Sequence, residues 1–178
     1  AFDGDTLKLF LERTSSQFGE YHAFEPDPTN AEQLRRKRDA LPACLRERIF
    51  IHQLALHSNQ AELNFAAWGG PSSHLATGGD GRVQGDALDA VIGRSCRVTF
   101  LKLDVEGAEI AALRGAQRVL TEQRPLAAVC VYHRPADLWE VPLQLKAWLG
   151  SSRLFLRQHG FDGWEMVCYA IPSGRECA

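Results

Sequence analysis

Residues 98–110, with the sequence VTFLKLDVEGAEI, constrain the fold more than any other part of the chain. An apolar strand pattern ends at Asp104 and Glu106, Gly107 permits a sharp bend, and a helical pattern begins near Ala108. A strand that turns at once into a helix is typical of α/β proteins. The sequence therefore predicts an α/β domain with acidic side chains at the end of this strand.

Three carboxylates, those of Asp104, Glu106 and Glu109, crowd this strand end. Neighbouring carboxylates raise one another's pKa and cost stability, so a group of them indicates a cation, a ligand or a proton-transfer step nearby. Glu109 has a simpler interpretation, because an acid in the first turn of a helix interacts favourably with the helix dipole. We expect Asp104 and Glu106 to be functional.

A second strand pattern covers residues 126–132 and is continuously apolar, which is typical of a strand buried on both faces of a parallel sheet. It ends at His133. An imidazole at the carboxyl end of a buried strand can act as a base or bind a substrate, and a hydrogen-bonded structural histidine is the other interpretation.

The start of the chain predicts a ligand-binding loop. Gly4 permits a positive φ, and Asp5 and Thr6 are suitable N-cap residues for the helix that follows. A short strand over residues 21–24 then ends at Glu25, and a carboxylate at this edge of an α/β sheet can accept hydrogen bonds from ribose hydroxyls.

The order of the expected elements predicts a three-layer α/β/α sandwich around a mainly parallel sheet, formed by one domain over residues 1–178. A hairpin excursion is expected at about residues 62–86, and strands at 153–157 and 165–171 predict a C-terminal antiparallel hairpin. Several candidate residues fall at carboxyl ends of strands, so we expect them to meet in one crevice. They are Gly4, Glu25, Leu56, Asp104 and His133.

Charge and cysteine usage exclude several classes of partner. The chain has 20 basic and 22 acidic residues, a net charge of −2, which provides no overall field for nucleic acid or an anionic membrane. Its five cysteines have no CxxC pair, and we expect Cys130 and Cys168 to be buried thiols. No apolar run approaches the ~18 residues of a membrane span, so the sequence predicts a cytoplasmic protein.

Four segments together resemble the FkbM-type family of S-adenosylmethionine-dependent methyltransferases. They are AFDGDT at residues 1–6, FEPDP at 24–28, KLDVEGAE at 102–109 and YHRPADLW at 132–139. The resemblance implies a Rossmann-like class I methyltransferase fold and methylation of a hydroxyl on a small molecule, a sugar or another natural product. The family's first strand and the glycine before its cofactor-loop alanine have no counterpart ahead of Ala1, so the sequence is expected to start inside that loop.

The resemblance also implies roles for single residues. The cofactor loop would hold the methionine part of S-adenosylmethionine, Glu25 with Pro26 the ribose, and the backbone at Ala55 and Leu56 the adenine, while Asp104 and Glu106 would face the methyl donor and acceptor. The loop residues are Phe2, Asp3, Gly4, Asp5 and Thr6.

Three points stay open at the level of sequence. The base that removes the acceptor proton is either His133 or a carboxylate of Asp104 and Glu106. A variant mechanism places a divalent cation on Asp104, Glu106 and a neighbouring residue, and hard oxygen ligands would favour Mg²⁺. Two other functions are an NAD-dependent oxidoreductase, although a full GxGxxG is missing, and a binding domain without catalysis. The sequence does not indicate an oligomeric state.

Overall fold

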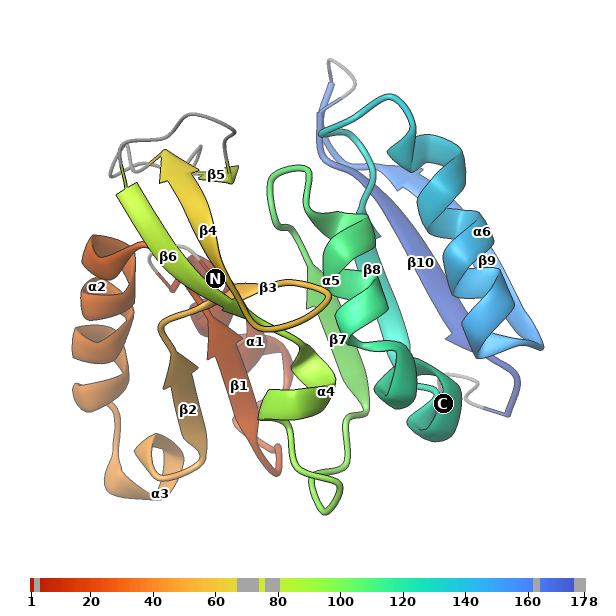
Figure 1. Ribbon diagram of the computed structural model, residues 1–178. Helices are drawn as coiled ribbons and strands as arrows, with labels where there is room; N and C mark the ends of the chain where they lie inside the picture. Colours follow the sequence, from red (N-terminus) through yellow and green to blue (C-terminus); the bar gives the residue numbers. More distant parts are fainter. Residues whose placement is uncertain (2–3, 67–73, 76–80, 162–163, 175–178) are drawn as a thin grey trace. The chain divides into compact units, whose positions relative to one another are not determined.

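Helices and strands alternate along most of the chain in a computed structural model that describes residues 1, 4–66, 74–75, 81–161 and 164–174 (Figure 1). Two compact units are present. The first comprises Ala1–Ala55 with Ala61–Gly85, and the second comprises Leu56–Gln60 with Asp86–Ala178. Each unit is described by itself.

The first unit is built on two parallel strands, β1 (Tyr21–Phe24) and β2 (Ile49–His52). Helices α1 (Asp5–Arg13), α2 (Pro28–Asp39) and α3 (Ala43–Arg46) accompany them. Their common core comprises Leu7, Ala23, Leu34 and Ile49, each at most 3% exposed.

Gly4 has the predicted positive φ, of 98°. A Cβ atom at this position would also lie only 2.9 Å from Leu34 Cδ1, so both conformation and packing require glycine. The prediction of the helix start is corrected by one or two residues, because Gly4 itself is the N-cap and Asp5 and Thr6 stand in the first turn of α1.

The predicted excursion is confirmed as an antiparallel pairing of β4 (Ala61–Ala66) with β6 (Gly81–Asp86). Two short strands, β3 (Ala55–Leu56) and β5 (His74–Leu75), extend it in the order β3-β6-β4-β5. Helix α4 (Leu88–Val91) follows and leads the chain toward the second sheet.

The sheet of the second unit contains β7 (Phe100–Leu103), β8 (Leu126–Cys130), β10 (Met166–Pro172) and β9 (Ser152–Gln158), in that spatial order. Strands β7 and β8 are parallel, whereas β10 runs antiparallel to both β8 and β9. The C-terminal hairpin is thus confirmed, but the expected mainly parallel sheet is wrong, since the described sheets are mixed. A continuous apolar run requires cover on both faces of a strand and does not report the direction of its neighbours.

Helices α5 (Glu109–Gly115) and α6 (Asp137–Leu149) pack on each other, and α6 also packs on β10 and β9 (Figure 1). A π-helical turn, η1 (Val119–Gln123), continues from α5. Cys130 and Cys168 are buried thiols, as predicted. Within the described residues, no helix is both long and apolar enough to cross a bilayer.

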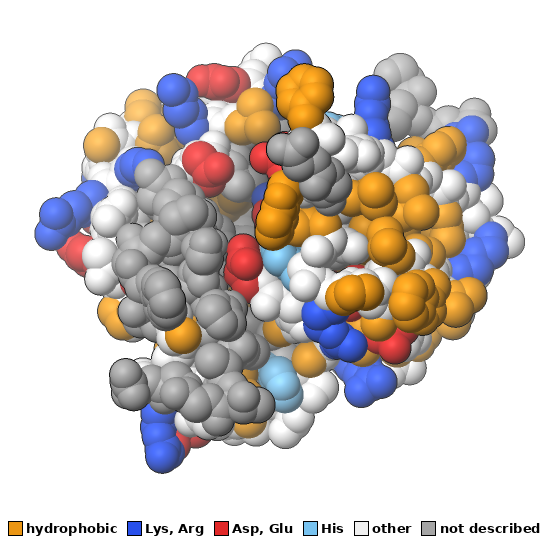
Figure 2. All heavy atoms as spheres, turned by 90° about the horizontal axis from the view of Figure 1, so that it is seen from above, with side chains coloured by type: hydrophobic (Ala, Val, Ile, Leu, Met, Phe, Trp, Pro, Cys, Tyr) orange, Lys and Arg blue, Asp and Glu red, His pale blue; other side chains and the backbone are white. Residues whose placement is uncertain are grey.

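Hydrophobic side chains gather over the second unit on the right-hand side of Figure 2. The exposed large hydrophobic residues of this unit include Leu143 on α6 and Phe155 and Leu156 on β9, which are 47–68% exposed. Strand β9 also stands last in its sheet among the described strands.

Substitution Gly115→Ala tests the packing that anchors the C-terminal end of α5. Helix propensity alone predicts a gain of up to about 1 kcal/mol. However, the new Cβ would lie 1.9 Å from the carbonyl oxygen of His57 and 3.0 Å from Ala87 Cα, so we expect a loss of about 1–3 kcal/mol in urea unfolding. In Gly93→Ala the nearest contact is 3.8 Å, and this control should unfold like the wild type. A Gly115→Ala protein as stable as the control would contradict the described backbone contact.

Candidate functional site

The turn between β7 and α5 positions the first two site residues. β7 ends at Leu103, and Glu106 and Gly107 both adopt positive φ, of 54° and 93°. The side-chain alternation of the strand therefore stops before Asp104, and the left-handed turn determines where the Glu106 carboxylate lies. A left-handed glutamate is a strained conformation of the kind that clusters at functional sites.

His133 joins these carboxylates from the loop that follows β8, the strand parallel to β7. Its Nε2 lies 3.7 Å from Asp104 Oδ1 and 3.6 Å from Glu106 Oε2. One potential ligand atom from each of the three residues lies within 4.8 Å of the others. The structure thus brings together Asp104, Glu106 and His133, as the sequence predicts; we name these three residues the acid–histidine cluster.

Glu109 orients the imidazole through a contact with its Nδ1 atom. Its side chain is fully buried, and its Oε1 lies 2.8 Å from His133 Nδ1 and accepts a hydrogen bond of 3.1 Å from the Val105 N–H. We assign the ring proton to Nδ1, with Glu109 Oε1 as its acceptor, which leaves the lone pair of a neutral ring on Nε2. The His133 side chain is 8% exposed, and within the described part of the chain its Nε2 has no hydrogen-bond partner.

The electrostatics of the cluster favour positive charge. Burial alone lowers the pKa of His133, but the hydrogen bond to Glu109 and the charges of Glu109, Glu106 and Asp104 outweigh burial and raise this pKa above its ordinary value. Burial likewise raises the pKa of Asp104, but Lys102 Nζ, 3.3 Å from Asp104 Oδ2, leads the opposing interactions that hold it below its ordinary value.

Two further neighbours complete the surroundings of Asp104. The Tyr132 hydroxyl donates a hydrogen bond of 3.3 Å to Asp104 Oδ1, and burial together with this negative charge raises the pKa of Tyr132. Burial and the nearby Asp104 charge raise the pKa of the Cys130 thiol, so it stays a neutral thiol. The Tyr132 hydrogen bond holds the Asp104 carboxylate in place.

The predicted cofactor residues of the first unit lie around the carboxyl end of β1. Glu25 directly follows this strand and is 6% exposed. Its Oε1 accepts the Asp27 N–H at 3.0 Å, and its Oε2 lies 3.1 Å from the amino group of Ala1. Pro26 follows Glu25, Gly4 to Thr6 form the start of α1, and Ala55 is in β3. Phe2 and Asp3 lie outside the described residues.

The other predicted residues belong to the second unit. Three of them form the acid–histidine cluster, and the fourth is Leu56 in β3, which is 6% exposed. The expected meeting of all these residues in one crevice stays a prediction, as do their individual roles.

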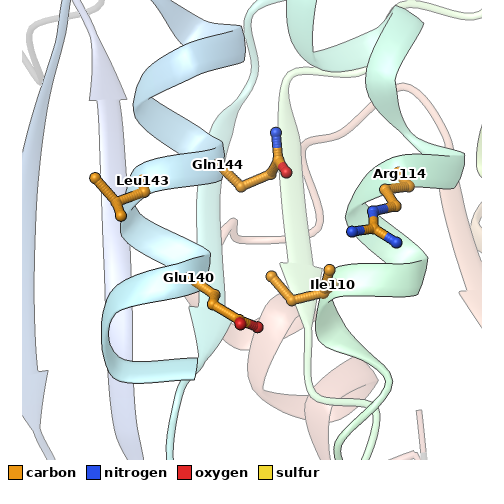
Figure 3. Close-up of a pocket in the computed structure, with 5 residues that line it drawn as sticks. All are labelled: Ile110, Arg114, Glu140, Leu143 and Gln144. Atoms are coloured by element: carbon orange, nitrogen blue, oxygen red, sulfur yellow. The ribbon is translucent and has the colours of Figure 1, made fainter. Parts of the chain in front are cut away.

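A shallow groove of about 360 Å³ runs between the outward-facing side chains of the packed helices α5 and α6 (Figure 3). Ile110 and Arg114 line it from α5, and Glu140, Leu143 and Gln144 line it from α6. None of the predicted site residues lines this groove, so we place the candidate site at the acid–histidine cluster instead.

Comparison with known families decides what kind of protein carries this cluster. The model of the methyltransferase FkbM domain matches residues 1–162, which include the whole acid–histidine cluster. The chain belongs to the FkbM methyltransferase family.

A solved structure agrees with this assignment. The methyltransferase FkbM from Methylobacillus flagellatus KT superposes with a TM-score of 0.79 at 25% sequence identity. The similarity covers 96% of the present chain and 41% of that protein, so the chain spans less than half the length of this relative. A search of curated protein sequences gave no match.

Glu109 stands in the first turn of α5, as the sequence predicts, but its side chain is also fully buried and hydrogen-bonded to His133. The sequence interpretation did not include this second contact. A charged residue followed directly by the apolar Ile110, Ala111 and Ala112 was a signal that it needs a partner. Tyr132 had no such signal, because an apolar strand accommodates tyrosine readily.

Substitution Glu109→Leu tests the orientation of the imidazole. In the wild type at alkaline pH, where the ring is neutral, ¹⁵N NMR of His133 should show the proton on Nδ1. Glu109→Leu removes the acceptor, so the spectrum should show a mixture of both tautomers. Glu122→Gln, an exposed substitution on η1, is the control and should leave the His133 signals unchanged. A wild-type ring protonated on Nε2 would contradict the assigned hydrogen bond.

Proposed function

We propose that this chain transfers a methyl group from S-adenosylmethionine to a hydroxyl of a small molecule, a sugar or another natural product. The observation that carries the proposal is the buried His133 Nε2, which has no hydrogen-bond partner among the described residues and faces two carboxylates near the carboxyl ends of adjacent parallel strands. This edge is where α/β sheets bind their ligands. Membership of the FkbM family supports the methyl transfer.

The first unit offers groups that fit the cofactor. Glu25 is a buried carboxylate at the end of β1, able to accept hydrogen bonds from ribose hydroxyls. The first turn of α1 lies at a helix N-terminus, where the positive end of the helix dipole suits the carboxylate of the methionine part. The buried backbone of Ala55 and Leu56 suits an adenine ring.

S-adenosylmethionine, when bound, supplies a methyl group on a positively charged sulfur, and its transfer to oxygen leaves the electron pair on sulfur and releases the hydroxyl proton. The residues of this chain position the acceptor and take up that proton. The acid–histidine cluster provides two carboxylates and an imidazole for this purpose. Glu109 and Tyr132 keep His133 and Asp104 in place.

Binding of S-adenosylmethionine by isothermal titration tests the first half of the proposal. The wild type should bind it saturably and should not bind NADH. Glu25→Ala should weaken binding about 10- to 100-fold, because it removes hydrogen bonds of a charged acceptor. The control Glu32→Ala changes an exposed acid of α2 and should bind like the wild type. Equal affinity of Glu25→Ala and the wild type would remove Glu25 from the cofactor site.

Turnover to S-adenosylhomocysteine tests the second half. With an acceptor chosen from a panel of sugars, polyketides, lipids and peptides, Glu106→Gln should lower kcat about 10²- to 10⁴-fold, since one member of the proton-accepting cluster is lost. Its affinity for S-adenosylmethionine should stay unchanged. The control Glu122→Gln should turn over normally. A fully active Glu106→Gln protein would show that the proton leaves elsewhere.

A further inference from the structure

The acid–histidine cluster holds three potential metal-ligand atoms close together, whereas proton transfer needs only one base. Asp104, Glu106 and His133 converge with one potential ligand atom each, within 4.8 Å of one another. Clustered acids alone are common on protein surfaces. What distinguishes this cluster is that the His133 side chain is 92% buried, yet its Nε2 faces both carboxylates and has no hydrogen-bond partner in the described part of the chain.

We propose that Asp104 Oδ1, Glu106 Oε2 and His133 Nε2 bind a divalent transition-metal ion, for which Zn²⁺ is the best fit. One imidazole and two carboxylates supply three protein ligands, and a fourth position remains for water or for an acceptor hydroxyl. The link between this ion and catalysis rests on the proposed function, whereas binding of the ion does not.

The second shell supports this assignment. Metal-binding histidines commonly donate their other ring N–H to a carboxylate, which fixes the tautomer and raises the basicity of the ligating nitrogen. Glu109 occupies that position, 2.8 Å from Nδ1 and fully buried. The Asp104 carboxylate is held in a similar way, by Tyr132 at Oδ1 and by Lys102 at Oδ2.

The nitrogen in the donor set favours zinc over magnesium, because imidazole suits Zn²⁺ better than Mg²⁺. His133 Nε2 lies 3.6 and 3.7 Å from the two carboxylates, so all three groups can approach one ion. The expectation of Mg²⁺ assumed oxygen ligands alone, and the nitrogen of His133 changes that preference.

An ion at this position would act on the acceptor. A hydroxyl in the fourth ligand position would be acidified by the cation and would lose its proton to solvent water at a lower pH than a free alcohol, so that the ion-bound cluster positions the acceptor without itself taking up the proton. The acceptor is therefore expected to present its hydroxyl to the ion, and compounds with an adjacent second oxygen are favoured because they can chelate it.

Titration of the chelator-treated 178-residue chain with ZnCl₂ and with MgCl₂ tests the proposal by calorimetry. We expect one Zn²⁺ per chain and at least tenfold weaker binding of Mg²⁺. His133→Ala and Asp104→Asn should each weaken Zn²⁺ binding at least tenfold, and Glu109→Gln about 10- to 100-fold through the second shell. Co²⁺ in place of Zn²⁺ gives an independent readout, since its visible absorption reports a tetrahedral site that His133→Ala should abolish.

Two control variants separate this site from adventitious binding. His159→Gln and Glu122→Gln change a histidine and an acid elsewhere in the second unit and should bind Zn²⁺ like the wild type. Unfolding curves of every variant establish that weaker binding does not come from loss of the fold. Absence of saturable Zn²⁺ binding, or equal binding by the wild type and His133→Ala, would overturn the proposal.

The two proposals fail in different experiments. S-adenosylmethionine binding is measured with chelator present, and Zn²⁺ binding is measured without S-adenosylmethionine. Zn²⁺ binding that depends on His133, without any binding of S-adenosylmethionine, would refute the proposed function and support the ion site. Methyl transfer that continues undiminished in chelator would refute the catalytic use of the ion and support the proposed function.

Discussion

The hydrogen bond between Glu109 and His133 is the interaction on which the candidate site depends. A single buried oxygen, Glu109 Oε1, contacts both the Val105 N–H in the turn after β7 and the imidazole in the loop after β8. It thereby joins the ends of two parallel strands to the start of α5. Without this carboxylate, the turn at Val105 and Glu106 and the ring of His133 would each lose a hydrogen bond that fixes their position. The distances within the acid–histidine cluster would then change.

The same region concentrates features that oppose stability. Three such features occur within one strand–turn–helix and the adjacent loop: a fully buried carboxylate, a glutamate with positive φ, and an imidazole nitrogen that has no hydrogen-bond partner in the part of the chain that the structure describes. An apolar side chain in place of a buried charge often stabilises a fold, so stability alone does not explain Glu109. Such local departures from good packing are expected at functional sites.

Much of this arrangement follows from the sequence, and the remainder has identifiable physical reasons. The acids after β7 and the histidine after β8 were predictable, because an apolar run that ends in a charged residue marks a strand end. The direction of β10 was not, since the continuous apolar pattern of Leu126–Cys130 is satisfied by a parallel neighbour on one side and an antiparallel one on the other. The role of Glu109 was also missed, because a charge in a first helical turn has the same local pattern whether solvent or a histidine receives it.

Strand β9 has a consequence for how copies of this protein meet one another. Among the described strands it stands last in its sheet, and it exposes Phe155 and Leu156, two features that favour pairing with another chain. Arg153 and Arg157 flank these hydrophobic residues and are exposed as well. Two such edges brought together would oppose four guanidinium charges, which is the gatekeeping that natural sheets use against aggregation. Arg153 and Arg157, which are not part of the acid–histidine cluster, would therefore oppose association of copies of the protein through β9.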